Sequence, residues 1–193
     1  MAWLRQIVAK VIINLRKRQA YLPSYFLARF MPVKVTAGED PVRLKKLRLS
    51  ALKDAPYAFG AKYEDELLLS DVIWQERIKN TIWCFVEADG VDIGLLAVDK
   101  ADKDRKSDCW LSSWWVKEEF RGRQIPQLML DWVIEKSLTQ GWQVIGLGVW
   151  PENLRARSAY KKLGFVEAQK PLPSRSLPGQ MYLGMYLQIT DSK

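Results

Sequence analysis

The sequence predicts an α/β (α+β) fold, in which a mixed, mostly antiparallel twisted sheet of six to seven strands is flanked by helices. The first sign is a set of three apolar runs, residues 81–87, 91–98 and 109–116. An Asp-Gly step joins the first two runs, which is a hairpin signal, and a charged loop joins the second to the third. Three antiparallel strands are therefore expected in the middle of the chain.

The second sign is a strand-helix-strand-helix order that begins with the third run. A helix is expected from Ile125 to Gly141, where the glycine ends it. Its apolar face consists of Ile125, Leu128, Met129, Trp132 and Val133. A strand at 143–149 follows, and then a short helix between Asn153 and Gly164. Because a helix separates the two strands, we expect them to lie in one sheet joined by a crossover.

The remaining elements complete the sheet and its covering helices. A short strand is expected at 33–36, followed by a helix for which Asp40 suits the N-cap and Pro41 the first turn. A further helix is expected at 71–79. After the crossover, another strand, a proline-rich loop and a final strand at 180–189 end the domain.

The turn between the central strand and the crossover helix has the sequence RGRQIP, residues 121–126. A helix N-terminus leaves backbone N–H groups without partners inside the helix, and these groups attract anions. The sequence therefore predicts a phosphate site at this turn.

Two motifs resemble those of the GNAT family of N-acetyltransferases. In that family a turn of the form R/Q-x-x-G-x-G/A holds the pyrophosphate of acetyl-CoA, and residues 116–126 occupy the corresponding place here. Downstream the family has N-x-x-A-x-x-x-Y-x-x-x-G-F. This chain matches every position of it, with Asn153, Ala156, Tyr160, Gly164 and Phe165. The resemblance covers residues 33–189 and implies the GNAT fold for a domain at 32–193.

The upstream motif departs from the family pattern at two positions. Gln124 and Pro126 stand where the family has glycines or a small residue. Glycine lets the backbone approach the pyrophosphate closely, whereas Gln124 adds a side chain and Pro126 has no N–H to donate. Proline in the first turn also stabilises a helix by itself. We therefore expect a helix N-terminus here that is a poorer cofactor cradle than the family's.

The resemblance implies that acetyl-CoA, or another acyl-CoA, is the co-substrate. The residues implied to bind it lie on the central strand, in the turn and on the second helix: Trp114, Trp115, Val116, Arg121, Gly122, Arg123, Gln124, Ile125, Asn153 and Tyr160. No metal site is expected. From the residues alone, Asn153 also suits a helix N-cap and Tyr160 a core position.

The family chemistry is direct attack of an amine on the thioester. The resemblance implies that the backbone N–H of Val116 or a neighbour polarises the carbonyl, and that Tyr160 is the catalytic acid that protonates the leaving thiolate. Many members use a carboxylate on or near the central strand as general base. Here the strand offers Ser112 and Ser113, with Asp108 just outside it, so no base is assigned.

Composition limits the chemistry further. The chain has 193 residues and 48% apolar content, which suits one globular domain with an extension. It has no histidine, which excludes Ser-His-Asp and Cys-His catalysis and histidine-ligated metal. Cys84 and Cys109 lack metal-like spacing and are expected to be small core residues in a reducing, cytoplasmic compartment. No apolar run is long enough to predict a transmembrane helix.

Residues 1–31 form a basic extension outside the region of resemblance. Residues 1–38 contain seven basic and no acidic side chains, so the rest of the chain carries 23 basic and 22 acidic ones. An apolar helical stripe runs through the extension: Leu4, Ile7, Val8, Val11, Ile12 and Leu15. Such a helix suits docking on the domain or a partner complex, binding to an anionic membrane surface, or organellar targeting. Nucleic acid is disfavoured because no base-reading motif accompanies the charge.

Two functions stay open from the sequence. The first is an acyl-CoA-dependent N-acyltransferase that acetylates an amine of a small molecule or protein, with an unknown acceptor. The second is a catalytically inactive GNAT-fold domain that serves as a binding or assembly subunit, held to a partner complex or membrane surface by residues 1–31. The acidic cluster 64–66 and Arg175 are each expected to be solvated rather than to meet the acceptor. The expected location is cytoplasmic, or membrane-peripheral or organellar if the extension serves those roles.

Overall fold

The structure is a computed structural model that describes residues 32–101 and 103–189. The predicted extension, residues 1–31, lies outside the described residues, so its helix and its roles stay predictions. None of the helices in the described part of the chain has the length and apolarity needed to span a bilayer.

Eight strands form the sheet, in the order β1-β2-β3-β4-β5-β8-β6, with β7 paired to β8. They are β1 (Val33–Ala37), β2 (Ile82–Ala88), β3 (Val91–Lys100), β4 (Cys109–Val116), β5 (Val144–Val149), β6 (Val166–Glu167), β7 (Leu172–Pro173) and β8 (Met181–Gln188). Every pairing is antiparallel except that of β4 with β5, which is parallel. The predicted fold class is thus confirmed, including the crossover, and the two-residue strand β7 adds to the expected number.

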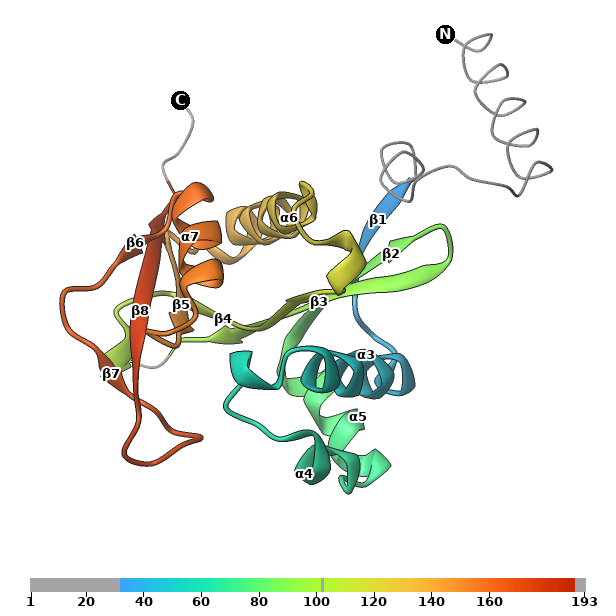
Figure 1. Ribbon diagram of the computed structural model, residues 1–193. Coiled ribbons are helices and arrows are strands. Elements are labelled where there is room, and N and C mark those ends of the chain that lie inside the picture. Colours follow the sequence, from blue (N-terminus) through green and yellow to red (C-terminus); the bar gives the residue numbers. More distant parts are fainter. Residues whose placement is uncertain (1–31, 102, 190–193) are drawn as a thin grey trace, which may run out of the picture. The chain divides into compact units, whose positions relative to one another are not determined.

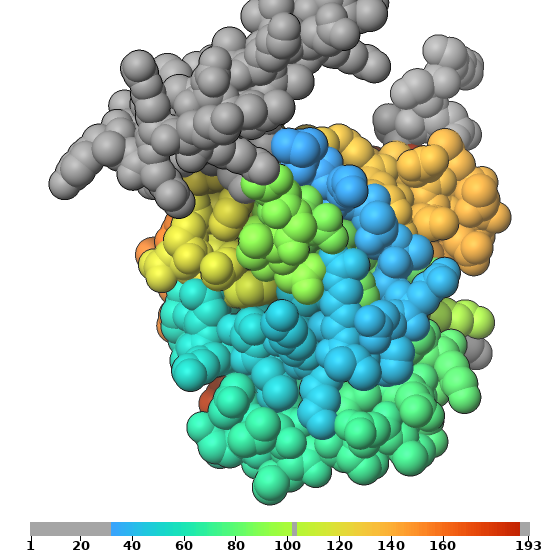
Figure 2. Space-filling view, turned by 90° about the vertical axis from the view of Figure 1, so that its right-hand side faces the viewer, coloured from blue at the N-terminus to red at the C-terminus, as the bar shows by residue number. Residues whose placement is uncertain are grey.

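Helices cover both faces of the sheet. They are α3 (Pro41–Asp54), α4 (Tyr63–Leu67), α5 (Asp71–Asn80), α6 (Ile125–Gln140) and α7 (Leu154–Lys162). Figure 1 shows α3, α4 and α5 on one face and α6 and α7 on the opposite face. In the space-filling view, α3, in light blue, packs directly on the teal and green residues of α4 and α5 (Figure 2).

The predicted helix ends have the expected capping contacts. The Asp40 carboxylate accepts hydrogen bonds from the N–H groups of Val42 and Arg43 at 2.9 and 3.2 Å. Helix α6 ends at Gly141, whose φ of 70° is the left-handed conformation that glycine adopts readily. Asn153 caps α7 by accepting from the N–H of Ala156 at 3.1 Å.

The buried face of α6 differs from the predicted one. Leu128 was expected to face the core but is 41% exposed, whereas Leu130 is 1% exposed. The buried stripe consists of Ile125, Met129, Leu130, Val133 and Ser137. Helix α6 packs on the sheet along this stripe, so the helix is rotated away from Leu128. Ser137 tolerates burial because its hydroxyl donates to the carbonyl oxygen of Ile134 at 2.6 Å.

The central strand β4 contains a bulge that aims its side chains. The partner of Leu95 is Trp115 but that of Ala97 is Ser112, so β4 has one residue more than β3 between these pairs. Ser113 lies within this bulge with a φ of 51°. Side chains alternate between the two faces along a regular strand, so residues an odd number of positions apart would lie on opposite faces. The extra residue shifts this alternation, and Trp110 and Trp115 therefore lie on the same face, the one that carries α3.

The strands β4 and β5 separate just before the bulge. Their parallel pairing runs from Cys109 opposite Ile145 to Leu111 opposite Leu147 and does not continue along β4. The later residues of β4 pair with β3 only. An opening therefore lies between the C-terminal ends of two adjacent parallel strands, a usual position for ligands in α/β proteins.

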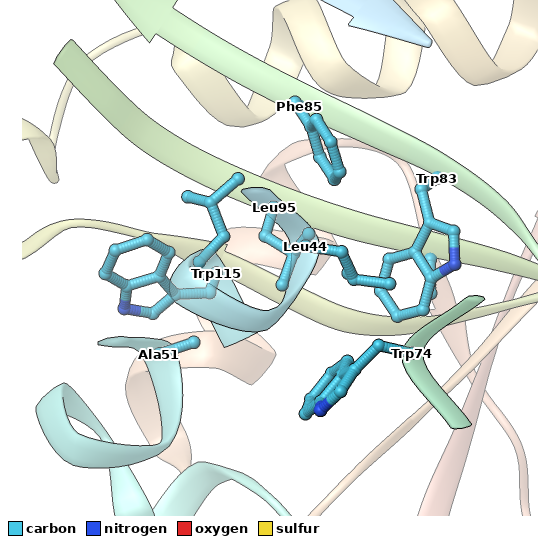
Figure 3. Close-up of a cluster of buried hydrophobic side chains, with 9 residues drawn as sticks. Leu44, Ala51, Trp74, Trp83, Phe85, Leu95 and Trp115 are labelled. Atoms are coloured by element: carbon cyan, nitrogen blue, oxygen red, sulfur yellow. The ribbon is translucent and has the colours of Figure 1, made fainter. Parts of the chain in front are cut away.

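An aromatic core holds α3 and α5 against the sheet. Figure 3 shows Leu44 and Ala51 of α3 among Trp83, Phe85, Leu95 and Trp115 of the strands, with Trp74 of α5. Four of the nine tryptophans, at 74, 83, 110 and 115, are at most 5% exposed. Core packing therefore accounts for four of the nine tryptophans.

Both cysteines are buried in the sheet, as predicted. Cys84 on β2 and Cys109 on β4 are each 0% exposed and carry free thiols. Burial raises the pKa of each thiol to about 12, with the charge of Asp108 adding to the effect at Cys109. Neither thiol is therefore suited to act as a nucleophile.

Candidate functional site

Two adjoining cavities lie where β4 and β5 separate. The large cavity, about 920 Å³, is lined by the end of α3, the loop after it, and the segment between β5 and α7. The small cavity, about 360 Å³, covers the opening itself. Both cavities are bordered by Phe59, Gly60, Ala61 and Trp150, so they form one continuous depression.

The small cavity straddles the two diverging strands. Leu111, Ser112 and Ser113 line it from β4. Gly148, Val149 and Trp150 line it from the end of β5 and the residue after it. Its other walls come from α3, the 58–61 loop and the 174–176 loop. A molecule bound there would meet the opening from the face that carries α3.

The turn at 121–126 forms a helix N-terminus with free amides. Gly122 has a φ of 77°, and a Cβ added there would meet nothing within 4 Å. Gln124 has a φ of −73°, so this position does not need glycine for its backbone conformation. Among the described residues, the N–H groups of Arg123, Gln124 and Ile125 have no hydrogen-bond partner. These donors suit a phosphate group, although Pro126 supplies none.

The arginine that begins this turn is held by the protein. Its Nε donates to the carbonyl oxygen of Val116 at 2.9 Å, and its Nη2 pairs with the carboxylate of Asp54. The Trp115 indole N–H donates to the same Asp54 oxygen at 2.7 Å. Arg121 therefore ties the turn to the end of β4 and to α3. The structure directs the guanidinium to Asp54, and a cofactor contact by Arg121 stays a prediction.

Arg123 is also occupied locally. Its Nη2 donates to the carbonyl oxygen of Glu119 at 2.8 Å, and its guanidinium lies 4.8 Å from the centre of the Phe120 ring. The available donors of the turn are therefore backbone N–H groups rather than guanidinium groups.

An aromatic cluster joins β4 to α7, and none of its three members lines either cavity. The ring of Trp114 lies 5.2 Å from that of Tyr160 and 6.4 Å from that of Phe165. Tyr160 is 6.1 Å from Phe165. The structure thus brings Trp114 of the central strand to Tyr160 of the downstream motif, 46 positions further along the chain.

The Tyr160 hydroxyl is available to a ligand. It has no hydrogen-bond partner within the described part of the chain, and it is not among the fully buried polar atoms that lack one. The residue is partly buried, and burial raises the pKa of Tyr160 to about 12. The phenol therefore stays protonated at neutral pH and can donate a hydrogen bond.

The other predicted residues divide between the site and the core. Asn153 lines the large cavity while capping α7. The Trp115 side chain is 5% exposed and packs against α3, so only its backbone remains for a cofactor. Ser112 lines the small cavity, and its hydroxyl donates to Asp99 at 2.9 Å. Asp54, which joins Trp115 to Arg121, was missed because no pattern around it signals these contacts.

The acidic cluster at 64–66 differs from its predicted solvated state at one position. Glu64 and Asp65 are exposed, as expected, but Glu66 is 6% exposed. The Glu66 carboxylate accepts from Arg48 at 3.0 and 3.1 Å and from Arg77 at 3.0 Å. Burial opposes its ionisation, yet the bonds and charges of both arginines hold the pKa of Glu66 below its usual value.

Comparison with known proteins decides the family. The model of the acetyltransferase (GNAT) family matches residues 40–165, more than half of the chain. The chain belongs to the GNAT family. No curated protein sequence matches it significantly.

Solved GNAT structures share the fold at low sequence identity. An acetyltransferase of the GNAT family from Streptococcus pneumoniae is 18% identical with a TM-score of 0.60, covering 82% of this chain and 100% of that one. The yncA protein of Salmonella typhimurium, solved with acetyl-CoA, is 14% identical with a TM-score of 0.61, covering 82% and 95%. RimL, a ribosomal L7/L12 α-N-protein acetyltransferase solved with CoA, is 11% identical with a TM-score of 0.62, covering 81% and 94%. The GNAT family uses acetyl-CoA, and two of these neighbours hold it or CoA.

Proposed function

We propose that this GNAT protein transfers an acetyl group from acetyl-CoA to a primary amine, by direct attack of the amine on the thioester. The observation that carries the proposal is the turn at 121–126. It presents three backbone N–H groups without a partner among the described residues at the start of α6, the helix that follows β4 after that strand has separated from β5. This arrangement suits a pyrophosphate with its attached arm running along β4.

Each neighbouring residue has a role in this proposal. The amides of Arg123, Gln124 and Ile125 hold the pyrophosphate, and Gly122 lets the backbone approach it. We assign Trp114 to the pantetheine arm because it lies on β4 beyond the last pair with β5, and we assign Asn153, which borders the large cavity, to the end of the arm. The backbone N–H of Val116 or a neighbour polarises the thioester carbonyl.

Tyr160 acts on the leaving sulfur. With a pKa of about 12, its phenol is a weaker acid than a free tyrosine, and a thiol has a reference pKa of about 8.5. Complete proton transfer from the phenol to the thiolate is therefore unfavourable. We assign Tyr160 a hydrogen bond to the sulfur that strengthens as negative charge develops, with the final proton supplied by water.

No side chain is assigned as the general base. Among the described residues, Glu64 and Glu152 line the large cavity, but no carboxylate lines the small cavity that covers the opening. The amine proton is therefore expected to leave through water, or the amine to arrive already neutral. This route favours activity that rises with pH as the acceptor amine deprotonates.

Isothermal titration calorimetry of the full chain with acetyl-CoA tests the cofactor site. The wild type is expected to bind with a Kd in the micromolar range. Gly122→Ala forces a side chain into the left-handed region at a cost of about 1–2 kcal/mol, which distorts the turn, so roughly tenfold weaker binding is expected.

Gly90→Ala is the matched control for this titration. Gly90 has a φ of 79° and open space at its Cβ, but it lies in the β2–β3 hairpin, away from the turn. The affinity of the Gly90→Ala variant for acetyl-CoA is expected to equal that of the wild type. Absence of binding by the wild type, or an equal loss in both variants, would contradict the proposed cofactor site. The next test would then be the assembly role predicted for residues 1–31. Removal of this segment is expected to abolish association with a partner or membrane in a co-sedimentation assay.

A further inference from the structure

We propose that the acceptor is a small primary amine that also carries a carboxylate, and that the small cavity binds this carboxylate through Arg48. The inference rests on the proposed function and adds the chemical class of the substrate. It is carried by a buried guanidinium with an unused donor, by the charge of the cavity lining, and by the size of the cavity.

Arg48 contributes a buried donor that the protein leaves without a partner. The residue is 7% exposed, and it lines the small cavity from α3. Its Nε and Nη2 donate to Glu66, whereas its Nη1 is fully buried and has no partner among the described residues. A buried guanidinium N–H without an acceptor is unfavourable, so a ligand oxygen at this position would be stabilising.

The charge around Arg48 favours an anion. Glu66 is shared between Arg48 and Arg77, so the three side chains together carry one net positive charge. The guanidinium of Arg48 is also held in place by the Phe59 ring, 4.8 Å from its centre. A fixed guanidinium is a preferred partner for carboxylate oxygens.

The rest of the lining has the same sign. Arg105 and Arg175 also border the small cavity, and Arg175 pairs at 3.6 Å with Asp104, which is not part of the lining. The described lining itself includes no acidic side chain. Arg105 lies over the Trp110 ring at 4.4 Å, which fixes it against the cavity wall. Concentrated positive charge in a concave site attracts anions and repels purely cationic amines.

The size and the remaining walls point to a small molecule with an apolar body. The cavity of about 360 Å³ lies at the lower end of the usual range for small-molecule sites. Besides the arginines, aromatic side chains form its walls: Phe59, Trp110, Trp150 and Tyr182. A carboxylate at Arg48 and an apolar group on the aromatic walls describe an amino acid with an apolar side chain.

The position of the cavity fits the reaction. Because Ser112, Ser113 and Val149 border it, a ligand held at Arg48 spans from α3 to the opening between β4 and β5. Its amino group can then face the opening, where the thioester is expected to emerge.

Calorimetric titration of the full chain with a matched pair of ligands tests the inference without needing turnover. L-Phenylalanine and phenethylamine differ only by the carboxylate, and both are titrated with and without CoA. The acid is expected to bind at least about tenfold more tightly, since a charge-assisted hydrogen bond to a buried donor contributes about 1.5–3 kcal/mol. Equal or tighter binding of the amine would overturn the inference, and so would the absence of binding by both ligands.

Arg48→Lys and Arg77→Lys form a matched pair of variants. Both arginines bind Glu66, but only Arg48 lines the cavity. The preference for the acid is expected to fall about tenfold in Arg48→Lys and to persist in Arg77→Lys. Equal effects in the two variants would assign Arg48 a structural role alone and overturn the inference.

Two further measurements separate this inference from other causes. Arg175→Gln changes a side chain that is 57% exposed, so folding is expected to be unaffected, and the preference for the acid is expected to fall severalfold. An unchanged preference in this variant would count against a cationic cavity. The acetyl-CoA titration is independent of Arg48: if acetyl-CoA binds and phenethylamine is acetylated while phenylalanine is not bound, the inference fails and the proposed function stands.

Discussion

Glu66→Ala is expected to lower the free energy of unfolding by about 3–5 kcal/mol, because removal of one partner leaves buried charges without compensation. Glu66 is the shared acceptor of Arg48, whose side chain is 8% exposed, and of Arg77. Without the carboxylate, the Arg48 guanidinium loses all of its hydrogen bonds to the protein. Urea denaturation followed by tryptophan fluorescence would measure the change.

Asp65→Ala is the control for this variant. Asp65 precedes Glu66 on the same helix and is exposed, so its removal is expected to change the free energy of unfolding by less than about 0.5 kcal/mol. Similar losses of unfolding free energy in both variants would show that the substitutions destabilise helix α4, and that the ion pairs of Glu66 are not the cause.

The same carboxylate predicts the direction of a pH effect. The pKa of Glu66 is lower in the folded protein than its reference value of 4.5. Its contribution to stability is therefore complete above the unfolded-state pKa and is lost as pH falls through the folded-state pKa. The loss of stability between about pH 5 and pH 3 is expected to be shallower in Glu66→Gln than in the wild type. Parallel curves for the two proteins would contradict this assignment.

Tyr160→Phe is expected to lower kcat about 100-fold, because the hydrogen bond to the leaving sulfur is lost, while leaving the affinity for acetyl-CoA and the stability nearly unchanged. The hydroxyl has no partner among residues 32–101 and 103–189, so its removal breaks no structural hydrogen bond. The ring contacts with Trp114 and Phe165 are retained by phenylalanine. Steady-state kinetics with an acceptor amine would measure the change in kcat. Calorimetric titration with acetyl-CoA would measure the affinity separately.

The pKa of Tyr160 adds a constraint on the pH profile. Because burial raises this pKa to about 12, the phenol does not titrate between pH 6 and pH 9, and no limb of the kcat profile in that range is expected to belong to it. Tyr186→Phe is a suitable control, since Tyr186 borders neither cavity, and its kcat is expected to stay within about twofold of the wild type. Wild-type kcat in Tyr160→Phe would remove Tyr160 from the mechanism.

Much of the fold could be predicted because its signals are local. The Asp-Gly step marks the β2–β3 hairpin, where Asp89 and Gly90 both have positive φ angles. Asp40, Gly141 and Asn153 mark helix ends through contacts with residues at most four positions away. Helix α4 was missed because five residues are too few to establish a helical period.

The rest depends on residues that meet only after folding. The bulge at Ser113 arises from the register between β3 and β4, and no residue type in β4 requires it. The burial of Glu66 depends on Arg48 and Arg77, which are 18 and 11 positions away. Arg121 meets Asp54 across 67 positions, so its assignment from the motif alone omitted its main contact. The structure also brings Trp114 against Tyr160, while the roles that the family motif implies for the two residues stay predictions.

The two buried thiols have a practical consequence for measuring the proposed acetyl transfer. Acetyl transfer releases one free sulfhydryl on CoA per turnover, which a disulfide reagent such as Ellman's can count continuously. Cys84 and Cys109 are the only cysteines in the chain, and burial both shields them and keeps them protonated. The folded protein is therefore expected to contribute almost no background colour, whereas two equivalents should appear when denaturant is added. The same reagent thus reports catalysis in the native protein and the fraction unfolded in each variant.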